Sequence, residues 1–293
     1  MKVSAECIPC LFERAYREIS RVTCEPEKLK RVMVEVLRVI CENFSVEAAP
    51  AYLGTLRERT IRRVLGVDPY KDLKKKANML ALRLLPRVRE KVFGDTKNGY
   101  ECFRRACMFS VAANAMEFDV SGYDFRLEEI EKTMESIGLA VDDTFKAYNH
   151  LKNSGKVLIL TDNAGEIVFD GLLAECLKVM GLKVVLAVKP KPVLNDATLE
   201  DAYEVGVDKV VDELKTIGSD TVGLIWSEAS EEIKKTFLDS NLVIAKGMGN
   251  YEALTELKNT GTNVLFLLKA KCNPVARSVG VERGANVALL RKL

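Results

Sequence analysis

An acidic and amide-rich cluster follows an apolar run near the middle of the chain. Residues 157–160 are all apolar, and Asp162, Asn163 and Glu166 come directly after them. A buried parallel strand that ends here would present oxygen ligands at its carboxyl edge, where open α/β sheets bind their ligands. Capping the next helix would need only one Asp or Asn side chain. The additional oxygens therefore favour a site for a metal ion or a phosphate group.

A second polar cluster, Asn195 and Asp196, lies after a Lys-Pro-Lys-Pro turn at 189–192. An Asx side chain here could simply cap a helix over 199–205. The alternative is that Asp196 adds a further carboxylate to the first cluster, and the residues alone leave both readings open.

The segment Lys246-Gly247-Met-Gly249-Asn250 is a glycine-rich turn between an expected strand and an expected helix. Such turns let backbone amides approach a phosphate at the beginning of a helix. The segment is not a dinucleotide fingerprint, because Glu252 stands where the third glycine of Gly-x-Gly-x-x-Gly would be. A tight turn without any ligand is the alternative interpretation.

Two lysines, Lys269 and Lys271, end the last expected strand. A lysine at a strand end usually extends into solvent. Here both would emerge beside the three other clusters, so that oxygen ligands, backbone donors and ammonium groups meet at one edge of a sheet. Phosphoryl transfer requires that combination, because cations neutralise the charge that develops on the phosphoryl oxygens.

Short β-branched runs alternate with helical stretches from Gly155 onward, which is typical of βαβ units on a parallel sheet. The expected strands are 156–161, 183–188, 208–212, 221–226, 241–246 and 263–269. Polar or glycine-rich turns follow the first, second, fifth and sixth of these runs, so those turns should share the carboxyl edge of the sheet.

The first half of the chain reads as helical. Apolar residues repeat at helical spacing over 29–40, Asp68-Pro69 begins another helix, and a further helix is expected over 127–137. We therefore predict an α/β protein with a three-layer α/β/α, mostly parallel sheet. Residues 1–151 would form an all-helical cap domain and 152–293 the α/β metal- and phosphate-binding domain, although the helical half could also be independent.

Composition limits the possible partners. The chain has 293 residues, 48% of them hydrophobic, with 44 Lys and Arg against 42 Asp and Glu. This balance gives no strong field for nucleic acid or an anionic membrane, so a small molecule is the expected partner. The sequence shows neither a long apolar run nor an apolar leader, and we expect a cytoplasmic protein. The oligomeric state is left open.

The eight cysteines are expected to be mostly reduced. Cys7-x-x-Cys10 has the spacing of a dithiol or of half a zinc site, which Cys272 or the pair Cys102 and Cys107 would complete. This motif supports a rival class, a zinc or redox protein without hydrolytic activity. The only histidine, His150, is expected on a helix surface.

Several blocks together resemble one family, the damage-control phosphatases of the domain-of-unknown-function 89, or acidic residue methyltransferase-like, group. The matching blocks run in order through nearly the whole chain: Cys7-Ile-Pro-Cys10, Asp68-Pro69-Tyr70, Val111-Ala-Ala-Asn114, Thr161-Asp-Asn-Ala-Gly-Glu166, Asn195-Asp196-Ala-Thr198, Lys246-Gly-Met-Gly-Asn-Tyr-Glu252 and Lys269-Ala-Lys-Cys272. The paired cysteines are typical of its short prokaryotic branch. Glu117 departs from the aspartate that often follows the asparagine block.

The resemblance implies a helical cap on an α/β/α domain and hydrolysis of small phosphorylated metabolites. It implies a divalent metal held by Asp162, Asn163 and Asp196, with manganese, cobalt or nickel often preferred over magnesium. It places Lys269 on the substrate phosphate. The other expected substrate-binding residues are Asn114, Glu166, Lys246, Gly247, Gly249 and Asn250.

The catalytic residues expected from this reading are Asp162, Asp196 and Lys269. Either a metal-activated water attacks phosphorus with Asp196 assisting, which we favour, or a carboxylate attacks directly and forms a phospho-enzyme. A nucleotide-dependent transferase is a second rival, disfavoured because the sequence has no Gly-x-x-x-x-Gly-Lys-Ser/Thr loop.

Overall fold

The computed structural model describes residues 1–95, 98–115, 138–151 and 155–293. Within these residues the strands form one sheet of seven, in the order β1-β7-β6-β5-β2-β3-β4. The strands are β1 (Val141–Asp142), β2 (Lys156–Leu160), β3 (Lys183–Val188), β4 (Glu213–Thr216), β5 (Leu242–Lys246), β6 (Asn263–Lys269) and β7 (Asn286–Lys292).

The sheet is parallel except where β7 runs antiparallel to β6. In the centre, β2 pairs with β3 and with β5 in parallel register, with Leu158 opposite Val185 on one side and Val243 on the other. The carboxyl ends of β2, β3, β5 and β6 therefore meet at one edge. This confirms the predicted placement of the polar turns.

Helices precede the sheet and connect its strands. They are α1 (Cys7–Val22), α2 (Pro26–Asn43), α3 (Pro50–Leu65), α4 (Lys71–Phe93), α5 (Gly99–Ala115), α7 (Thr144–Leu151), α8 (Glu166–Val179), α9 (Leu199–Glu204), α10 (Glu231–Leu238), α11 (Gly247–Leu254) and α12 (Asn273–Val279). Two short 3₁₀ turns are η1 (Val207–Lys209) and η2 (Trp226–Glu228).

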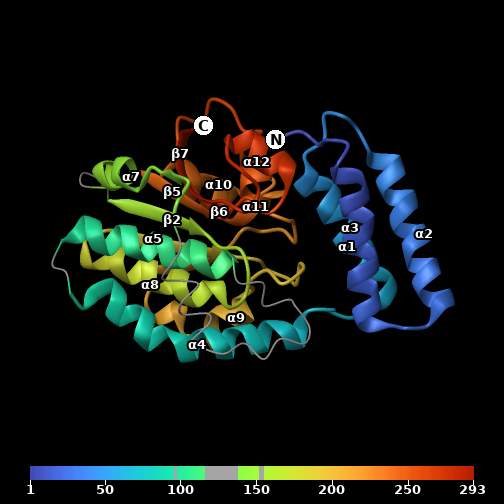
Figure 1. Cartoon of the computed structure of the whole chain (residues 1–293), viewed down its shortest axis with the longest axis horizontal. Coiled ribbons are helices and arrows are strands. Elements are labelled where there is room, and N and C mark those ends of the chain that lie inside the picture. Colours follow the sequence, from blue (N-terminus) through green and yellow to red (C-terminus); the bar gives the residue numbers. More distant parts are fainter. Residues whose placement is uncertain (96–97, 116–137, 152–154) are drawn as a thin grey trace.

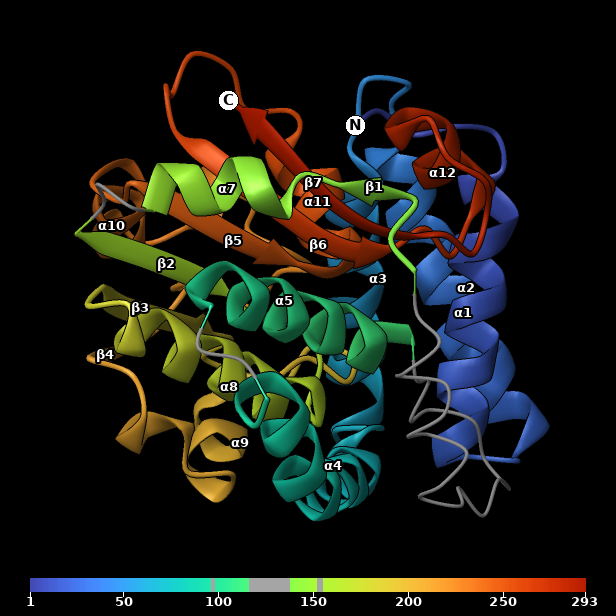
Figure 2. The ribbon, with the colours of Figure 1, turned by 60° about the vertical axis from the view of Figure 1, so that its left-hand side comes forward.

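Both faces of the sheet are buried, as parallel sheets require. Val157 and Ile159 of β2 pack into one core with α4, α5 and α8, while Leu158 and Leu160 pack into the other with α10, α11 and α12. Figure 2 shows α5 and α8 on one side of the strands. The alternation follows from the two-residue period of a strand and produces the predicted three layers.

The first three helices have a core of their own, in which Ile19, Val36 and Ile61 are fully buried. Figure 1 shows α1, α2 and α3 side by side at the end of the molecule opposite α7. Helices α4 and α5, in contrast, share a core with α8 and the sheet. The division at residues 151 and 152 stays a prediction, and its expected linker lies mostly outside the described residues.

Two expected strands were wrong. Residues 208–212 lie in and after η1, and the strand comes later as β4, whose residues are all half-buried as at a sheet edge. Residues 221–226 contain no strand, because Thr221 Oγ1 donates to Gly223 O at 2.8 Å and closes a local turn. Of the apolar side chains there, Leu224 is buried, while Val222, Ile225 and Trp226 are half-buried, and this mixture resembles strand patterning in the sequence.

Strands β1 and β7 were not predicted. The helix expected over 127–137 and the residue Glu117 lie outside the described residues. None of the described helices has the length and apolar character needed to cross a membrane.

Candidate functional site

Two loops at the carboxyl edge pair with each other and bring the acidic residues together. Asn163, after β2, forms an antiparallel bridge with Asp196, after β3. The Ala197 N–H also donates to Asp162 O at 2.8 Å. Asp196, more than thirty positions later in the sequence, thus lies beside Asp162 and Asn163 because β2 and β3 are neighbours.

Helix capping does not account for these side chains. Helix α8 has Gly165 at its N-cap and receives no side-chain capping hydrogen bond. Helix α9 is capped by Thr198, whose hydroxyl and backbone N–H both donate to Asp201 Oδ2. Asp162, Asn163 and Asp196 are therefore available for another role.

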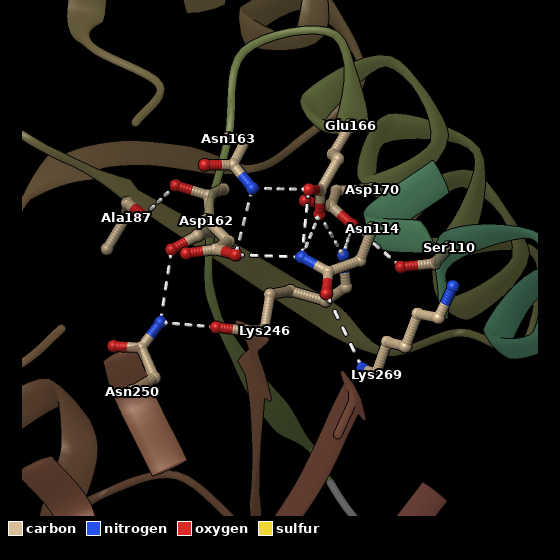
Figure 3. A network of polar contacts seen from close by, with 11 residues as sticks. Ser110, Asn114, Asp162, Asn163, Glu166, Asp170, Ala187, Lys246, Asn250 and Lys269 are labelled. Atoms are coloured by element: carbon tan, nitrogen blue, oxygen red, sulfur yellow. Dashed lines mark hydrogen bonds and ion pairs between the residues drawn. The ribbon is translucent and has the colours of Figure 1, made fainter. Parts of the chain in front are cut away.

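Asn114 of α5 links the two carboxylates of the first cluster. Its amide nitrogen donates to Asp162 Oδ2 at 2.8 Å and to both carboxylate oxygens of Glu166, at 2.8 and 3.0 Å. Its amide oxygen accepts from the Lys269 backbone N–H at 3.4 Å. Figure 3 shows this side chain at the centre of the network. Asn114 therefore ties α5 to the ends of β2 and β6 and to the first residue of α8.

Lys246, at the end of β5, is a fully buried cation beneath the cluster. Its Nζ lies 3.2 Å from Glu166 Oε2 and 2.9 Å from Asp170 Oδ1, and Ser110 donates to the same Asp170 oxygen at 2.8 Å. Burial alone would lower the pKa of Lys246, but Asp170 and Glu166 outweigh it and the net shift is upward. Lys246 thus remains charged and is shared between Glu166 and Asp170.

The predicted glycine turn is the first turn of α11. Asn250 fastens it, because its amide nitrogen donates to Thr161 O at 3.1 Å and to Lys246 O at 2.7 Å, while its oxygen accepts from Leu224 N at 3.0 Å. Gly247 has a φ of 74°, and a Cβ atom there would lie 1.9 Å from Asp162 Oδ2. Only glycine lets this backbone approach the carboxylate so closely.

A second buried lysine, Lys189, faces Asp196. Its Nζ lies 3.5 Å from Asp196 Oδ2 and donates to Gly223 O at 3.1 Å. Burial lowers its pKa, partly offset by Asp196 and Asp162. The sequence analysis did not assign Lys189, Asp170 or Ser110. Asp170 had a usable signal, since it lies one helical turn after Glu166 on the same face.

The two aspartates are short of positive charge. Burial raises the pKa of Asp162 to about 8, with further increases from Glu166 and Asp196 and a reduction from Lys271 and Lys246. Burial likewise raises the pKa of Asp196 to about 6, against the opposing effect of Lys189. A bound cation would relieve this excess of negative charge.

The lysines that end β6 lie at the same edge. In Figure 3 the side chain of Lys269 extends past Asn114, on the side of Ser110. Its ammonium makes no ion pair with another described residue. Lys271 is one of the cations that lower the pKa of Asp162. Both lysines thus remain candidates to meet an anion here.

The oxygen donors fit a hard divalent cation. Among the described residues, however, no three His, Cys, Asp or Glu side chains are grouped so as to hold a metal by themselves. A cation between Asp162 and Asp196 would therefore need the amide oxygen of Asn163 together with ligands from outside the protein. Magnesium and manganese sites commonly include such water or phosphate ligands.

Six of the eight cysteines fall into two groups. Cys102 and Cys107 of α5 neighbour Cys176 of α8. The pKa values of Cys107 and Cys176 are raised mainly by burial and further by a neighbouring thiol. Cys272 instead neighbours Cys7 and Cys10. The pair on α5 therefore does not complete a site with Cys7 and Cys10, whereas Cys272 lies near them.

A family model described as the damage-control phosphatase ARMT1-like domain matches residues 3–287. An uncharacterized protein of Methanocaldococcus jannaschii is 38% identical over 99% of this chain and 96% of its own length. A damage-control phosphatase of Archaeoglobus fulgidus is also 38% identical, over 98% and 99%. The crystal structure of a DUF89 family protein of Pyrococcus horikoshii superimposes with a TM-score of 0.88, at 30% identity and full coverage of both chains.

Proposed function

The chain belongs to the damage-control phosphatase ARMT1-like family, and from this membership and the geometry of the site we propose that it is a metal-dependent phosphatase. Its substrates would be small phosphorylated metabolites, such as sugar or cofactor phosphates. Family membership favours this function over a zinc or redox protein and over a nucleotide-dependent transferase.

One observation carries the proposal, the juxtaposition of Asp162 and Asp196 at the carboxyl edge. Both carboxyl groups have a raised pKa, and neither serves as a helix cap. Two buried acidic groups at one site cost stability when both are ionised, even with Lys189 beside Asp196. Such an arrangement is expected where a divalent metal and an anionic substrate bind.

Asp162, Asn163 and Asp196 would hold the metal. When bound, a divalent cation supplies neutralising charge to the phosphoryl oxygens and lowers the pKa of water. Asp196 would also accept the proton of the attacking water at its carboxylate. Lys189, 3.5 Å away, holds that carboxylate in place.

The substrate phosphate would lie between the metal and the end of β6. Lys269 supplies an ammonium, and the backbone amides of Gly247 and Gly249 add donors in the first turn of α11. Asn114 lies beside Asp162, and its amide would donate to a phosphate oxygen in place of one of its present contacts to Asp162 or Glu166. Glu166, Lys246 and Asn250 support the site from beneath, since their polar atoms already contact one another or the backbone.

The test is hydrolysis of p-nitrophenyl phosphate by protein stripped of metal with a chelator and then supplied with manganese, cobalt, nickel or magnesium. We expect activity to disappear on chelation and to return with metal. A panel of sugar and cofactor phosphates, assayed by phosphate release, then defines the substrate class.

Asp162→Asn should abolish the metal-restored activity, whereas Asp239→Asn should leave it unchanged, because Asp239 is exposed at the end of α10, remote from the carboxyl edge. Full activity in excess chelator, in protein that contains no metal by elemental analysis, would refute the proposal.

A further inference from the structure

Three cysteines lie where α1 and α12 begin. Cys7 is the first residue of α1, and Cys272 is the residue before α12. Glu6 Oε1 accepts from Asn273 Nδ2 at 3.3 Å, and Glu6 also forms an ion pair with Arg277. Because Glu6 precedes Cys7 and Asn273 follows Cys272, these contacts place the two cysteines on segments that touch each other. Figure 2 shows α12 close to α1.

The three thiols differ in their access to solvent. Cys10 is exposed, while Cys7 and Cys272 are half-buried. The Cys7 sulfur is held locally, since the Ser4 backbone N–H donates to Sγ at 3.5 Å and the Ser4 hydroxyl lies 3.6 Å from it. Cys10 is therefore the thiol that a reagent from solvent reaches first.

Electrostatic coupling supports the same grouping. Burial is the first cause of the raised pKa of Cys272, and Glu252, Cys7 and Cys10 raise it further. The pKa of Arg277 is raised first by Glu6, with smaller contributions from Cys272 and Cys7. The thiols thus share one environment, with a guanidinium beside them.

The spacing of Cys7 and Cys10 suits a disulfide. Residues three apart in an α-helix have Cα atoms about 5 Å from each other. Disulfides join Cα atoms roughly 4.4–6.8 Å apart, so the bond can form without unwinding α1. Among the described side chains, no three His, Cys, Asp or Glu are grouped so as to hold a metal, at these thiols or elsewhere.

We propose that Cys7, Cys10 and Cys272 form a thiol–disulfide exchange site for low-molecular-weight disulfides. The Cys10 thiolate attacks a disulfide RSSR, which forms a mixed disulfide and releases RS⁻. Cys7 then attacks the Cys10 sulfur, which forms the Cys7–Cys10 disulfide and releases a second RS⁻. Two protein thiols are oxidised, one RSSR is reduced to two thiols, and the two protons go to the released thiolates.

Cys272 connects this site to the carboxyl edge of the sheet. It can attack the Cys7–Cys10 disulfide, which transfers the bond to Cys272 and frees one of the two α1 thiols. The resulting link would join α1 to the loop after β6. That loop contacts α11, since the Lys271 backbone N–H donates to Met248 Sδ at 3.3 Å. The exchange chemistry itself does not depend on phosphatase activity.

The experiment equilibrates the full reduced chain with mixtures of reduced and oxidised glutathione, quenches in acid and alkylates the free thiols. Peptide mapping by mass spectrometry should find a disulfide within the peptide that carries Cys7 and Cys10, or between it and the peptide that carries Cys272. The bond should form reversibly and before any other. Mapping the unaltered chain requires no variant to fold.

The control variant Cys24→Ser with Cys41→Ser should oxidise like the unaltered chain, because both cysteines are exposed elsewhere, on or between α1 and α2. Cys7→Ser with Cys10→Ser should lose the disulfide. The proposal is overturned if all three thiols stay alkylatable in oxidised glutathione, or if other cysteines oxidise first. Stoichiometric zinc released by thiol alkylation would also overturn it.

Discussion

Replacement of Gly247 by Ala tests whether the Asp162 carboxylate must stand where the structure places it. The new Cβ atom would lie 1.9 Å from Oδ2 and 2.2 Å from Cγ, whereas Cβ atoms essentially never approach another heavy atom within 3.0 Å. The carboxylate and the first turn of α11 must therefore separate by about 1 Å. A displacement of this size at a reacting group costs on the order of a hundredfold in rate.

The substitution also introduces backbone strain, because Gly247 has a φ of 74°. A left-handed conformation costs a non-glycine residue roughly 1–2 kcal/mol. Gly261 provides a matched control, since its φ is also 74° but a Cβ atom there would meet nothing within 4 Å. Gly261→Ala should therefore lower the melting temperature by a few degrees, at roughly 2–4 °C per kcal/mol, and leave activity unchanged.

The assay compares kcat/KM on p-nitrophenyl phosphate and manganese affinity by calorimetry in both variants. Gly247→Ala should lose about a hundredfold in kcat/KM and bind manganese more weakly, beyond the stability loss that Gly261→Ala shows. If folded Gly247→Ala retained the parent kcat/KM and manganese affinity, the close approach of α11 to Asp162 would have no functional meaning.

Three further outcomes are expected. The raised pKa values of Asp162, about 8, and Asp196, about 6, mean that the folded chain binds these protons more tightly than the unfolded chain does. Their contribution to the stability of metal-free protein should therefore fall as the pH rises from about 4 to about 8. Urea titrations should show a smaller fall in the free energy of unfolding for Asp162→Asn than for the parent protein. An equal fall in the variant and the parent would contradict this expectation. Lys269→Ala should lower kcat/KM roughly tenfold to a hundredfold, because one charge-assisted contact to phosphate is lost. Its manganese affinity should be nearly unchanged. Kinetics equal to those of the parent would show that Lys269 does not bind the substrate and only extends into solvent. The double variant Cys7→Ser with Cys10→Ser should retain turnover when folded and metal-loaded, because we place the metal and substrate at the carboxyl edge of the sheet. Complete loss of turnover in this variant would show that the thiols have a catalytic role.

Strand patterning succeeded where burial was complete and failed at the edges of the sheet. The runs at β2, β3, β5 and β6 are continuous apolar segments, because helices cover both faces of these strands. Strands at the edge, such as β4, are half-buried and carry weaker patterns. Loop 221–226 resembles a strand in the sequence because its apolar side chains are buried or half-buried. Its Val222 N–H donates to Thr55 Oγ1 at 2.9 Å and not to a strand.

The sequence by itself determined the α/β class, the parallel central strands and the cluster at Asp162, because these depend on local periodicity and on which residue types follow a strand. The tertiary structure alone decided what surrounds the cluster. Lys189 and Lys246 look like ordinary strand ends in the sequence, yet both are buried ion-pair partners in the folded chain. Asn114 reaches the site from α5, and Asn273 contacts Glu6 from the opposite end of the chain. Such pairings depend on strand order and helix packing, which bring together residues that no local pattern connects.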